Sequence, residues 1–162
     1  MIMNKAYLLT GSNLGNREEN ITVAKTLIEI HCGGISRLSS VYETAAWGKT
    51  DQDAFLNQVL EIETSLKAIQ LIRRILKIEK MIGRIRKEKY GPRLIDIDIL
   101  LFNNEKHQFP LLTIPHPELQ NRRFALVPLA EIAAEIMHPV LNKSVNELLQ
   151  SCPDKLDVKK YR

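Results

Sequence analysis

Two acids and a cluster of basic residues stand close together in the stretch GRIRKEKYGPRLIDIDILLF, residues 83–102. Asp96 and Asp98 alternate with isoleucine and leucine in its apolar second half, a pattern typical of a strand. Because alternate side chains of a strand face the same way, the two carboxylates share a face, with Cβ atoms ~7 Å apart. Two like charges at the end of a core strand are costly unless water or a cation offsets them. The pair is therefore a candidate Mg²⁺ site.

The first half of the same stretch carries positive charge suited to an anion; its basic residues are Arg84, Arg86, Lys87, Lys89 and Arg93. Guanidinium groups match phosphate oxygens, and Mg²⁺ commonly binds one or two carboxylates together with substrate phosphates. The stretch thus predicts a Mg²⁺–nucleotide site, with a shaped loop at Gly91-Pro92 that closes over the nucleotide. The plainer alternatives are a solvated charged loop, and acids that only pair with Arg93 or a lysine.

Further candidates lie outside this stretch. His116 stands between two prolines with Arg122 close by, and it is either a phosphate contact or an ordinary surface or core histidine. Phe124 is either a core residue or a flat face on which a ring stacks. Asn57, in an apolar strand, either bonds within the core or reads the edge of a heterocycle. The glycine loop 11–15 lacks the lysine of a P-loop and the dinucleotide spacing, so it is predicted to be a plain turn.

Hydrophobic periodicity predicts the order β-α-β-β-α-β. Strands are expected over residues 5–10, 35–42, 55–63 and 94–103, with helices over 16–31 and from a cap at Ser65 to Ile82. This order is the signature of a ferredoxin-like α+β sandwich, in which two helices cover one face of an antiparallel sheet. Ile97, Ile99 and Leu101 are expected to share the face opposite the two aspartates.

The C-terminal third is expected to add smaller elements to this core. A hairpin arm over residues 107–112, a short apolar helix over 124–134 broken by Pro128, and a last helix with the capping box Ser144–Glu147 are predicted. The charged tail from Pro153 is expected to fray.

Size and composition indicate a single domain over residues 1–162. The formal charge of +4 suits an anionic ligand, but it is too small to indicate nucleic acid by itself. Cys32 and Cys152 lack metal-ligand spacing and are predicted to be free thiols of a reducing compartment. With no long apolar run and no signal-peptide pattern, the chain is expected to be soluble and cytoplasmic.

Several stretches together resemble one family, the 6-hydroxymethyl-7,8-dihydropterin pyrophosphokinases of folate biosynthesis. The resemblance runs from about Ala6 to Pro139, and its most specific parts are GPRLIDIDI and IPHPELQNRRFAL. The other stretches that carry it are GSNLG at 11–15, YET at 42–44, FLN at 55–57 and VPLAEIAAE at 127–135.

This resemblance implies a ferredoxin-like fold, two Mg²⁺ ions, ATP as co-substrate and a reduced pterin as acceptor of the β,γ-pyrophosphate, with release of AMP. The chain is also expected to be a monomer without nucleic-acid or membrane partners. By motif match, the metal ligands are Asp96 and Asp98, and the catalytic group adds Arg84 and Arg93. The implied ATP contacts are Arg86, Lys87, Lys89, Ile99, His116 and Arg122, and the implied pterin contacts are Thr44, Phe55, Asn57 and Phe124. Glu79 matches an acid of the family pattern, without a role that the sequence defines.

Two other kinds of protein fit parts of the pattern. A ferredoxin-like RNA-binding module would stack bases on strand aromatics, but these strands carry few, and the aspartates would repel a phosphate backbone. A pterin-binding relative without transferase activity is the third alternative, against which the complete set of arginines and aspartates argues. Binding to an oligonucleotide or to ATP, with and without Mg²⁺, separates the first alternative from the nucleotide site.

Overall fold

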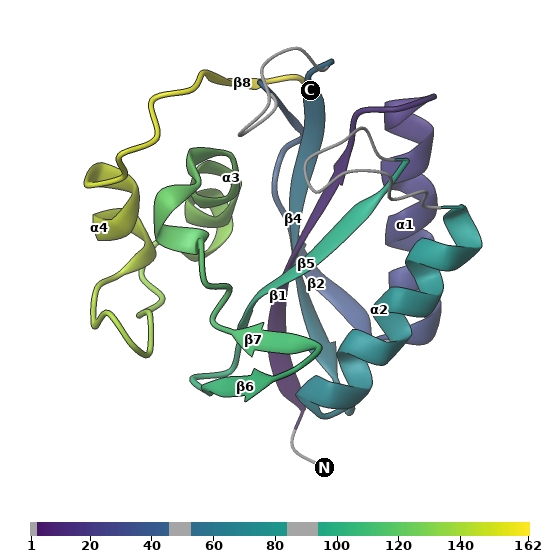
Figure 1. The fold of residues 1–162 in the computed structure, drawn as a ribbon, viewed down its shortest axis with the longest axis horizontal. Coiled ribbons are helices and arrows are strands. Elements are labelled where there is room, and N and C mark those ends of the chain that lie inside the picture. Colours follow the sequence, from purple (N-terminus) through teal and green to yellow (C-terminus); the bar gives the residue numbers. More distant parts are fainter. Residues whose placement is uncertain (1–2, 46–52, 84–93) are drawn as a thin grey trace.

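The computed structural model describes residues 3–45, 53–83 and 94–162, which form a central antiparallel sheet between two layers of helices (Figure 1). The strand order is β5-β1-β4-β3-β8, and β2 also pairs with β4. The predicted antiparallel sheet with two long helices is confirmed. In chain order the elements are β1 (Asn4–Ser12), α1 (Arg17–His31), β2 (Gly34–Leu38), β3 (Tyr42–Thr44), β4 (Phe55–Thr64), α2 (Ala68–Ile82), β5 (Asp96–Phe102), β6 (His107–Phe109), β7 (Leu112–Ile114), the 3-10 helix Leu119–Asn121, α3 (Arg123–Ala133), α4 (Val145–Gln150) and β8 (Val158–Lys160).

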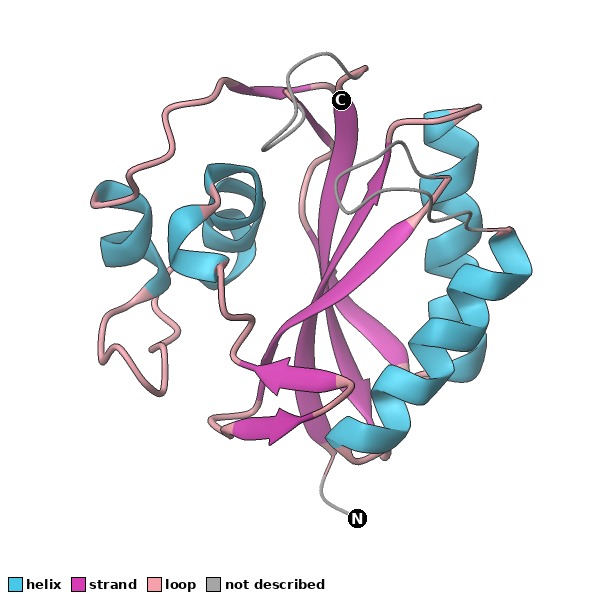
Figure 2. Ribbon diagram, in the orientation of Figure 1, coloured by secondary structure: helices cyan, strands magenta, loops and turns pink. Residues whose placement is uncertain are grey.

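Each face of the sheet is covered by its own hydrophobic core, and Figure 2 shows the helices on both sides. The first core lies between the sheet and helices α1 and α2, and it includes Leu8, Ile28, Ile62, Ile75, Ile97 and Ile99. The second core lies between the opposite face and helices α3 and α4, and it includes Tyr7, Leu9, Val59, Leu126, Leu129 and Leu148. The two cysteines are free, as predicted, and both are buried.

A β-bulge in β5 changes which side chains face the helices. Leu8 of β1 pairs with Ile99, but Tyr7 pairs with Leu101, so Leu100 is an extra residue between them. Leu101 is therefore buried in the second core, and the prediction that it shares a face with Ile99 is wrong. Asp96 and Asp98 precede the bulge and keep the alternation that the sequence indicated.

The strand predicted over residues 35–42 is in fact two strands, β2 and β3, interrupted at Ser39. The Ser39 hydroxyl accepts a hydrogen bond of 2.9 Å from the Val59 N–H, so a side chain takes a place in the ladder that backbone would otherwise occupy. The Gln58 side-chain amide donates to the Ser39 carbonyl at 2.8 Å. After this break β3 runs from Tyr42 to Thr44, two residues beyond the end of the predicted strand.

The helices agree with the sequence at two capped ends and differ from it at one helix start and at one internal proline. Asn16 caps α1, and Ser144 forms the predicted capping box with Glu147. Ser65 does not cap α2, because the helix begins later, at Ala68, where the Gln70 side chain accepts from the Lys67 N–H at 2.8 Å. Pro128 lies inside α3 without breaking it.

The C-terminal tail is ordered, contrary to the prediction that it frays. Its strand β8 pairs with β3, which carries Thr44. Beyond β8, the Tyr161 N–H donates to the Val41 carbonyl at 2.8 Å, and Arg162 forms an ion pair of 3.0 Å with Glu18 of α1. The tail therefore covers the outer edge of β3.

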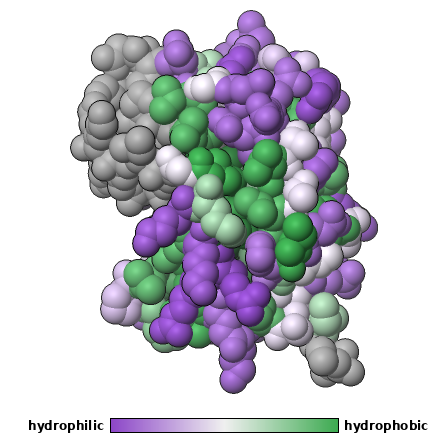
Figure 3. Space-filling model, turned by 90° about the vertical axis from the view of Figure 1, so that its right-hand side faces the viewer, coloured by the Kyte–Doolittle hydropathy of each residue, from purple (hydrophilic) through white to green (hydrophobic). Residues whose placement is uncertain are grey.

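The outer side of α1 and α2 is not uniformly polar. Val23, Ile30, Leu76 and Met81 are exposed, and Figure 3 shows hydrophobic residues gathered between hydrophilic ones on this side. Among the described residues, no helix is long and apolar enough to cross a membrane.

Candidate active site on the face opposite α1 and α2

Asp96 and Asp98 lie at the start of β5, both half-buried, on the face of the sheet turned away from α1 and α2. Their alternation with Ile97 and Ile99, which are buried in the first core, fixes this orientation. Gly11 of β1 pairs with Asp96 on one side and with Asn57 of β4 on the other. Asp96, Gly11 and Asn57 therefore lie next to one another on three neighbouring strands, and we call these three residues the row of Asp96.

Gly11 provides the space that this row needs. A Cβ atom at Gly11 would lie 2.7 Å from Oδ1 of Asn57 and 3.5 Å from Cδ1 of Phe55. Since a distance of 2.7 Å is well inside van der Waals contact, the absence of a side chain lets the amide lean toward Asp96. Gly11 belongs to β1 and not to the predicted turn, and only the strand order reveals its role.

Thr44 and Asn57, both assigned to the pterin, are in direct contact. The Asn57 side-chain amide donates a hydrogen bond of 2.7 Å to the Thr44 hydroxyl, and both residues are almost fully buried. Phe55 pairs with Thr44 across β3 and β4 and is half-buried on the same face as Asn57. Asn57 thus connects the row of Asp96 to Thr44 and Phe55, which lie on the same face of the sheet.

His116 is fixed by both its backbone and its ring. Its N–H donates to the Leu100 carbonyl of β5 at 3.0 Å, and its Nδ1 accepts from the Glu118 N–H at 3.1 Å, which leaves Nε2 as the protonated nitrogen. Burial lowers the pKa of His116 to about 4; Arg122 acts in the same direction, while Asp96 and Glu118 oppose it. At neutral pH the imidazole is therefore uncharged and can donate from Nε2.

Arg122 and Phe124 stand at the start of α3. The Arg122 guanidinium carbon lies 5.7 Å from the centroid of the Phe124 ring, within cation–π range. The ring packs against the second core, on the side of the sheet where Phe55 and Asn57 also lie. The structure thus brings the C-terminal motif to the same face as the strand residues.

His116 is one of the residues that line a hollow of about 500 Å³. It is large enough for a nucleoside-sized ligand. Its lining includes Thr113, His116, Pro117, Gln120, His138 and Leu141.

Glu79, which has no role that the sequence defines, also lies at this site. Its Oε2 accepts a hydrogen bond of 2.8 Å from the N–H of Ile97, the residue between the two aspartates. Sequence spacing could not reveal this contact, because it joins the last turn of α2 to β5.

Some predicted site residues cannot be placed and one lies elsewhere. Arg84, Arg86, Lys87, Lys89 and Arg93 are outside the described residues. The Ile99 side chain is buried in the first core, on the far face from Asp98, so only its backbone could contact ATP.

The donor chemistry at Asp96 and Asp98 fits Mg²⁺. This ion binds proteins through one or two carboxylates and keeps other positions for water and substrate phosphates. Within the described residues, no group of three or more His, Cys, Asp or Glu side chains forms a complete protein-only metal site. The pair therefore suits an ion that arrives with a phosphate ligand.

The fold and the site together define a sheet protein with a carboxylate pair suited to a metal–phosphate ligand, beside a buried hydroxyl–amide pair and an aromatic ring. Residues 7–134 match the family model described as 7,8-dihydro-6-hydroxymethylpterin-pyrophosphokinase (HPPK). The chain belongs to this family.

Curated relatives agree with the family model. The chain is 43% identical over 145 residues to the 2-amino-4-hydroxy-6-hydroxymethyldihydropteridine pyrophosphokinase of Aquifex aeolicus, covering 90% of each chain. It is 42% identical over 134 residues to the enzyme of the same name from Bacillus subtilis, covering 82% of this chain and 80% of that one.

Solved structures agree in fold. The Plasmodium falciparum HPPK-DHPS structure with pterin and p-hydroxybenzoate superimposes with a TM-score of 0.74 at 18% identity. The match covers 93% of this chain but only 42% of that one, so the present chain spans less than half of that protein.

Proposed function

We propose that the chain transfers the β,γ-pyrophosphate of ATP to the hydroxymethyl oxygen of 6-hydroxymethyl-7,8-dihydropterin, a step of folate biosynthesis. The pterin oxygen forms a bond to the β-phosphorus, the bond from that phosphorus to the α,β-bridging oxygen breaks, and AMP leaves. The pterin hydroxyl proton is released. The observation that carries the proposal is the cross-strand row in which Asp96 and Asn57 flank Gly11 on one face of the sheet.

Asp96 and Asp98 would hold two Mg²⁺ ions. When bound, Mg²⁺ neutralises phosphate charge and lowers the pKa of an oxygen that it binds. The two carboxylates share one face of β5, which supports the proposal that both would hold the ions. Bound Mg²⁺ would thereby make the hydroxymethyl proton easier to lose.

The pterin would lie over β3 and β4. Thr44 and Asn57 offer a hydroxyl and an amide that can match the donors and acceptors of the pterin edge. Phe55 and Phe124 would stack on the two faces of its ring. Orientation of this kind places the hydroxymethyl oxygen for attack, and positioning supplies much of the rate in phosphoryl-type transfer.

ATP would lie along β5 and the His116 segment. The neutral His116 donates from Nε2, and Arg122 supplies positive charge next to it. The hollow that His116 helps to line would take the adenine. The basic residues Arg84, Arg86, Lys87, Lys89 and Arg93 would contact the phosphates.

The proposal includes a finer description of the fold. The strand order β5-β1-β4-β2, with α1 and α2 on one face, supports the ferredoxin-like class. We assign residues 1–162 to one pyrophosphokinase domain that acts as a cytoplasmic monomer without nucleic-acid or membrane partners.

Product analysis tests the proposal. The protein is mixed with ATP, Mg²⁺ and 6-hydroxymethyl-7,8-dihydropterin, and the nucleotides are separated over time. AMP that rises in step with pterin diphosphate supports pyrophosphoryl transfer. ADP instead of AMP would show attack at the γ-phosphorus and overturn the proposal, as would binding of both ligands without turnover.

A further inference from the structure

Glu79 makes an unusual connection between a helix and the strand that carries the aspartate pair. It lies in the last turn of α2, it is only 3% exposed, and its Oε2 accepts from the Ile97 N–H at 2.8 Å. Ile97 lies between Asp96 and Asp98. The contact therefore restrains the backbone between the two carboxylates.

The position of β5 in the sheet explains why such a contact is needed. Among the described residues, β5 is the last strand on its side of the order, so backbone groups on its outer edge have no strand partner there. Glu79 accepts from the Ile97 N–H there, and the His116 N–H donates to the Leu100 carbonyl further along. These two hydrogen bonds satisfy backbone groups of β5 that a neighbouring strand would otherwise satisfy.

We propose that Glu79 is a positioning residue for the reaction: its carboxylate fixes the β5 backbone at Ile97 and so sets the geometry in which Asp96 and Asp98 receive Mg²⁺. This inference rests on the proposed metal role of the aspartates. Residues that orient metal ligands through a second layer of hydrogen bonds commonly change metal affinity or activity by about 10–100-fold when removed.

The backbone of Glu79 extends the same connection to the end of α2. The N–H of Gly83, which ends the helix with φ 92°, lies 3.2 Å from the Glu79 carbonyl oxygen. Glu79 therefore links three features: the end of α2, the edge of β5 and the aspartate pair. The basic stretch of the sequence follows directly after Gly83.

The test compares Glu79→Ala, which removes the acceptor, with Glu79→Gln, which keeps an acceptor oxygen. Two properties are measured besides turnover: amide hydrogen exchange at Ile97 and the Mg²⁺ dissociation constant by calorimetry with a non-hydrolysable ATP analogue. In Glu79→Ala we expect faster exchange at Ile97 and a Mg²⁺ dissociation constant raised about 10–100-fold. Glu79→Gln should remain closer to the wild type in both.

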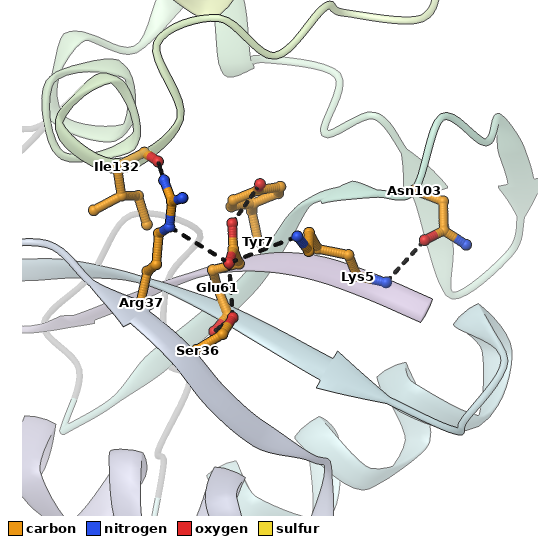
Figure 4. Close-up of polar contacts among 7 residues, drawn as sticks. All are labelled: Lys5, Tyr7, Ser36, Arg37, Glu61, Asn103 and Ile132. Carbon is orange, nitrogen blue, oxygen red and sulfur yellow. Dashed lines mark hydrogen bonds and ion pairs between the residues drawn. The ribbon is translucent and has the colours of Figure 1, made fainter. Parts of the chain in front are cut away.

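Glu61 of β4 provides a matched control, because it is another buried carboxylate that bonds to groups of the sheet, and it is 4% exposed. It is bonded to Tyr7 and Ser36 at 2.6 and 2.7 Å, and it lies between Lys5 and Arg37 (Figure 4). Glu61→Ala should lower the melting temperature without a matching change in Mg²⁺ affinity.

The amide of Leu60, in the central part of β4, serves as the reference for global unfolding. Exchange at Ile97 that accelerates more than exchange at Leu60 reports a local effect in the Glu79 variants. If Glu79→Ala does not fold, Glu79→Asp carries the test, because it keeps the charge but is one methylene too short to reach Ile97.

Three results would overturn the inference: unchanged Ile97 exchange in a folded Glu79→Ala protein, unchanged Mg²⁺ affinity, or equal loss of Mg²⁺ affinity in Glu61→Ala. Failure of the proposed function would look different. A wild-type protein without pyrophosphoryl transfer would refute that function, while Ile97 exchange and Mg²⁺ binding would still decide the role of Glu79.

Discussion

The side-chain amide of Asn57 donates a hydrogen bond of 2.7 Å to the hydroxyl of Thr44, between neighbouring strands of the sheet. The two residues are 2% and 3% exposed, so neither can replace the contact with water. The bond leaves the Asn57 oxygen and the second amide hydrogen as groups that can face a ring edge. Orientation of this amide therefore depends on Thr44.

Thr44→Val is expected to weaken pterin binding more than ATP binding. Valine has nearly the shape of threonine but cannot accept from Asn57, and an unsatisfied buried donor costs about 1–3 kcal/mol. The KM for the pterin should rise about 5- to 100-fold, with a much smaller change for ATP. Thr22→Val, which alters a helix-surface threonine on α1, is the control and should leave both constants unchanged. Equal changes in the two KM values would contradict the assignment.

Gly11→Ala should act through the same amide. Its Cβ would lie 2.7 Å from Oδ1 of Asn57, so the amide must move away from the row of Asp96. We expect a higher pterin KM and a lower kcat, measured by steady-state kinetics. Gly34→Ala in β2 is the matched control, because a Cβ there meets no atom within 4 Å. Normal kinetics of Gly11→Ala would show that the amide can shift without consequence.

Some features of the site follow from neighbouring residues along the chain, and others depend on strand pairing and helix packing. The alternation in β5 correctly predicted that Asp96 and Asp98 share a face, because that depends only on neighbours along the chain. The bulge that turns Leu101 to the second core was not predictable in this way, since it is a property of the pairing with β1. The Gly11–Asn57 approach and the Glu79–Ile97 bond likewise depend on strand order and helix packing.

The C-terminal tail illustrates the same limit. Val158–Lys160 is short and mostly charged, and such a segment has little tendency to form a strand alone. It pairs because β3 offers an open edge, and the two residues that follow it, Tyr161 and Arg162, contact Glu18 of α1. Pairing with β3 therefore orders the tail, although its charged composition predicted that it frays.

Asp98→Asn tests the metal role directly. The substitution keeps the size of the side chain and removes one negative charge, so it weakens cation binding without creating a cavity. Turnover should fall at least about 100-fold, since metal stabilisation of phosphate charge is worth several kcal/mol. The pterin dissociation constant, measured by fluorescence, should change less. Asp157→Asn, at a carboxylate 73% exposed in the tail, is the control and should leave turnover unchanged.

Glu61 should make the stability of the protein depend on pH. Burial by itself raises the pKa of this carboxyl, but hydrogen bonds from Tyr7 and Ser36 and the charges of Lys5 and Arg37 outweigh burial and lower the pKa overall. The folded protein therefore favours the ionised form more than the unfolded chain does. The resulting stability is fully present above the unfolded pKa of about 4.3 and is lost as the pH falls through the lower folded pKa.

Tyr7→Phe separates the Glu61 contribution from other acidic groups. The Tyr7 hydroxyl donates to Glu61 at 2.6 Å, and a hydrogen bond to a charged group contributes about 1.5–3 kcal/mol. Urea unfolding at pH 7 should show a loss of about that size, and the loss should shrink at a pH below the folded pKa, where Glu61 is protonated in both proteins. Since the pair lies away from the aspartate row, the KM values for ATP and pterin should not change. A loss of equal size at both pH values would show that the tyrosine stabilises the sheet through packing and not through the Glu61 charge.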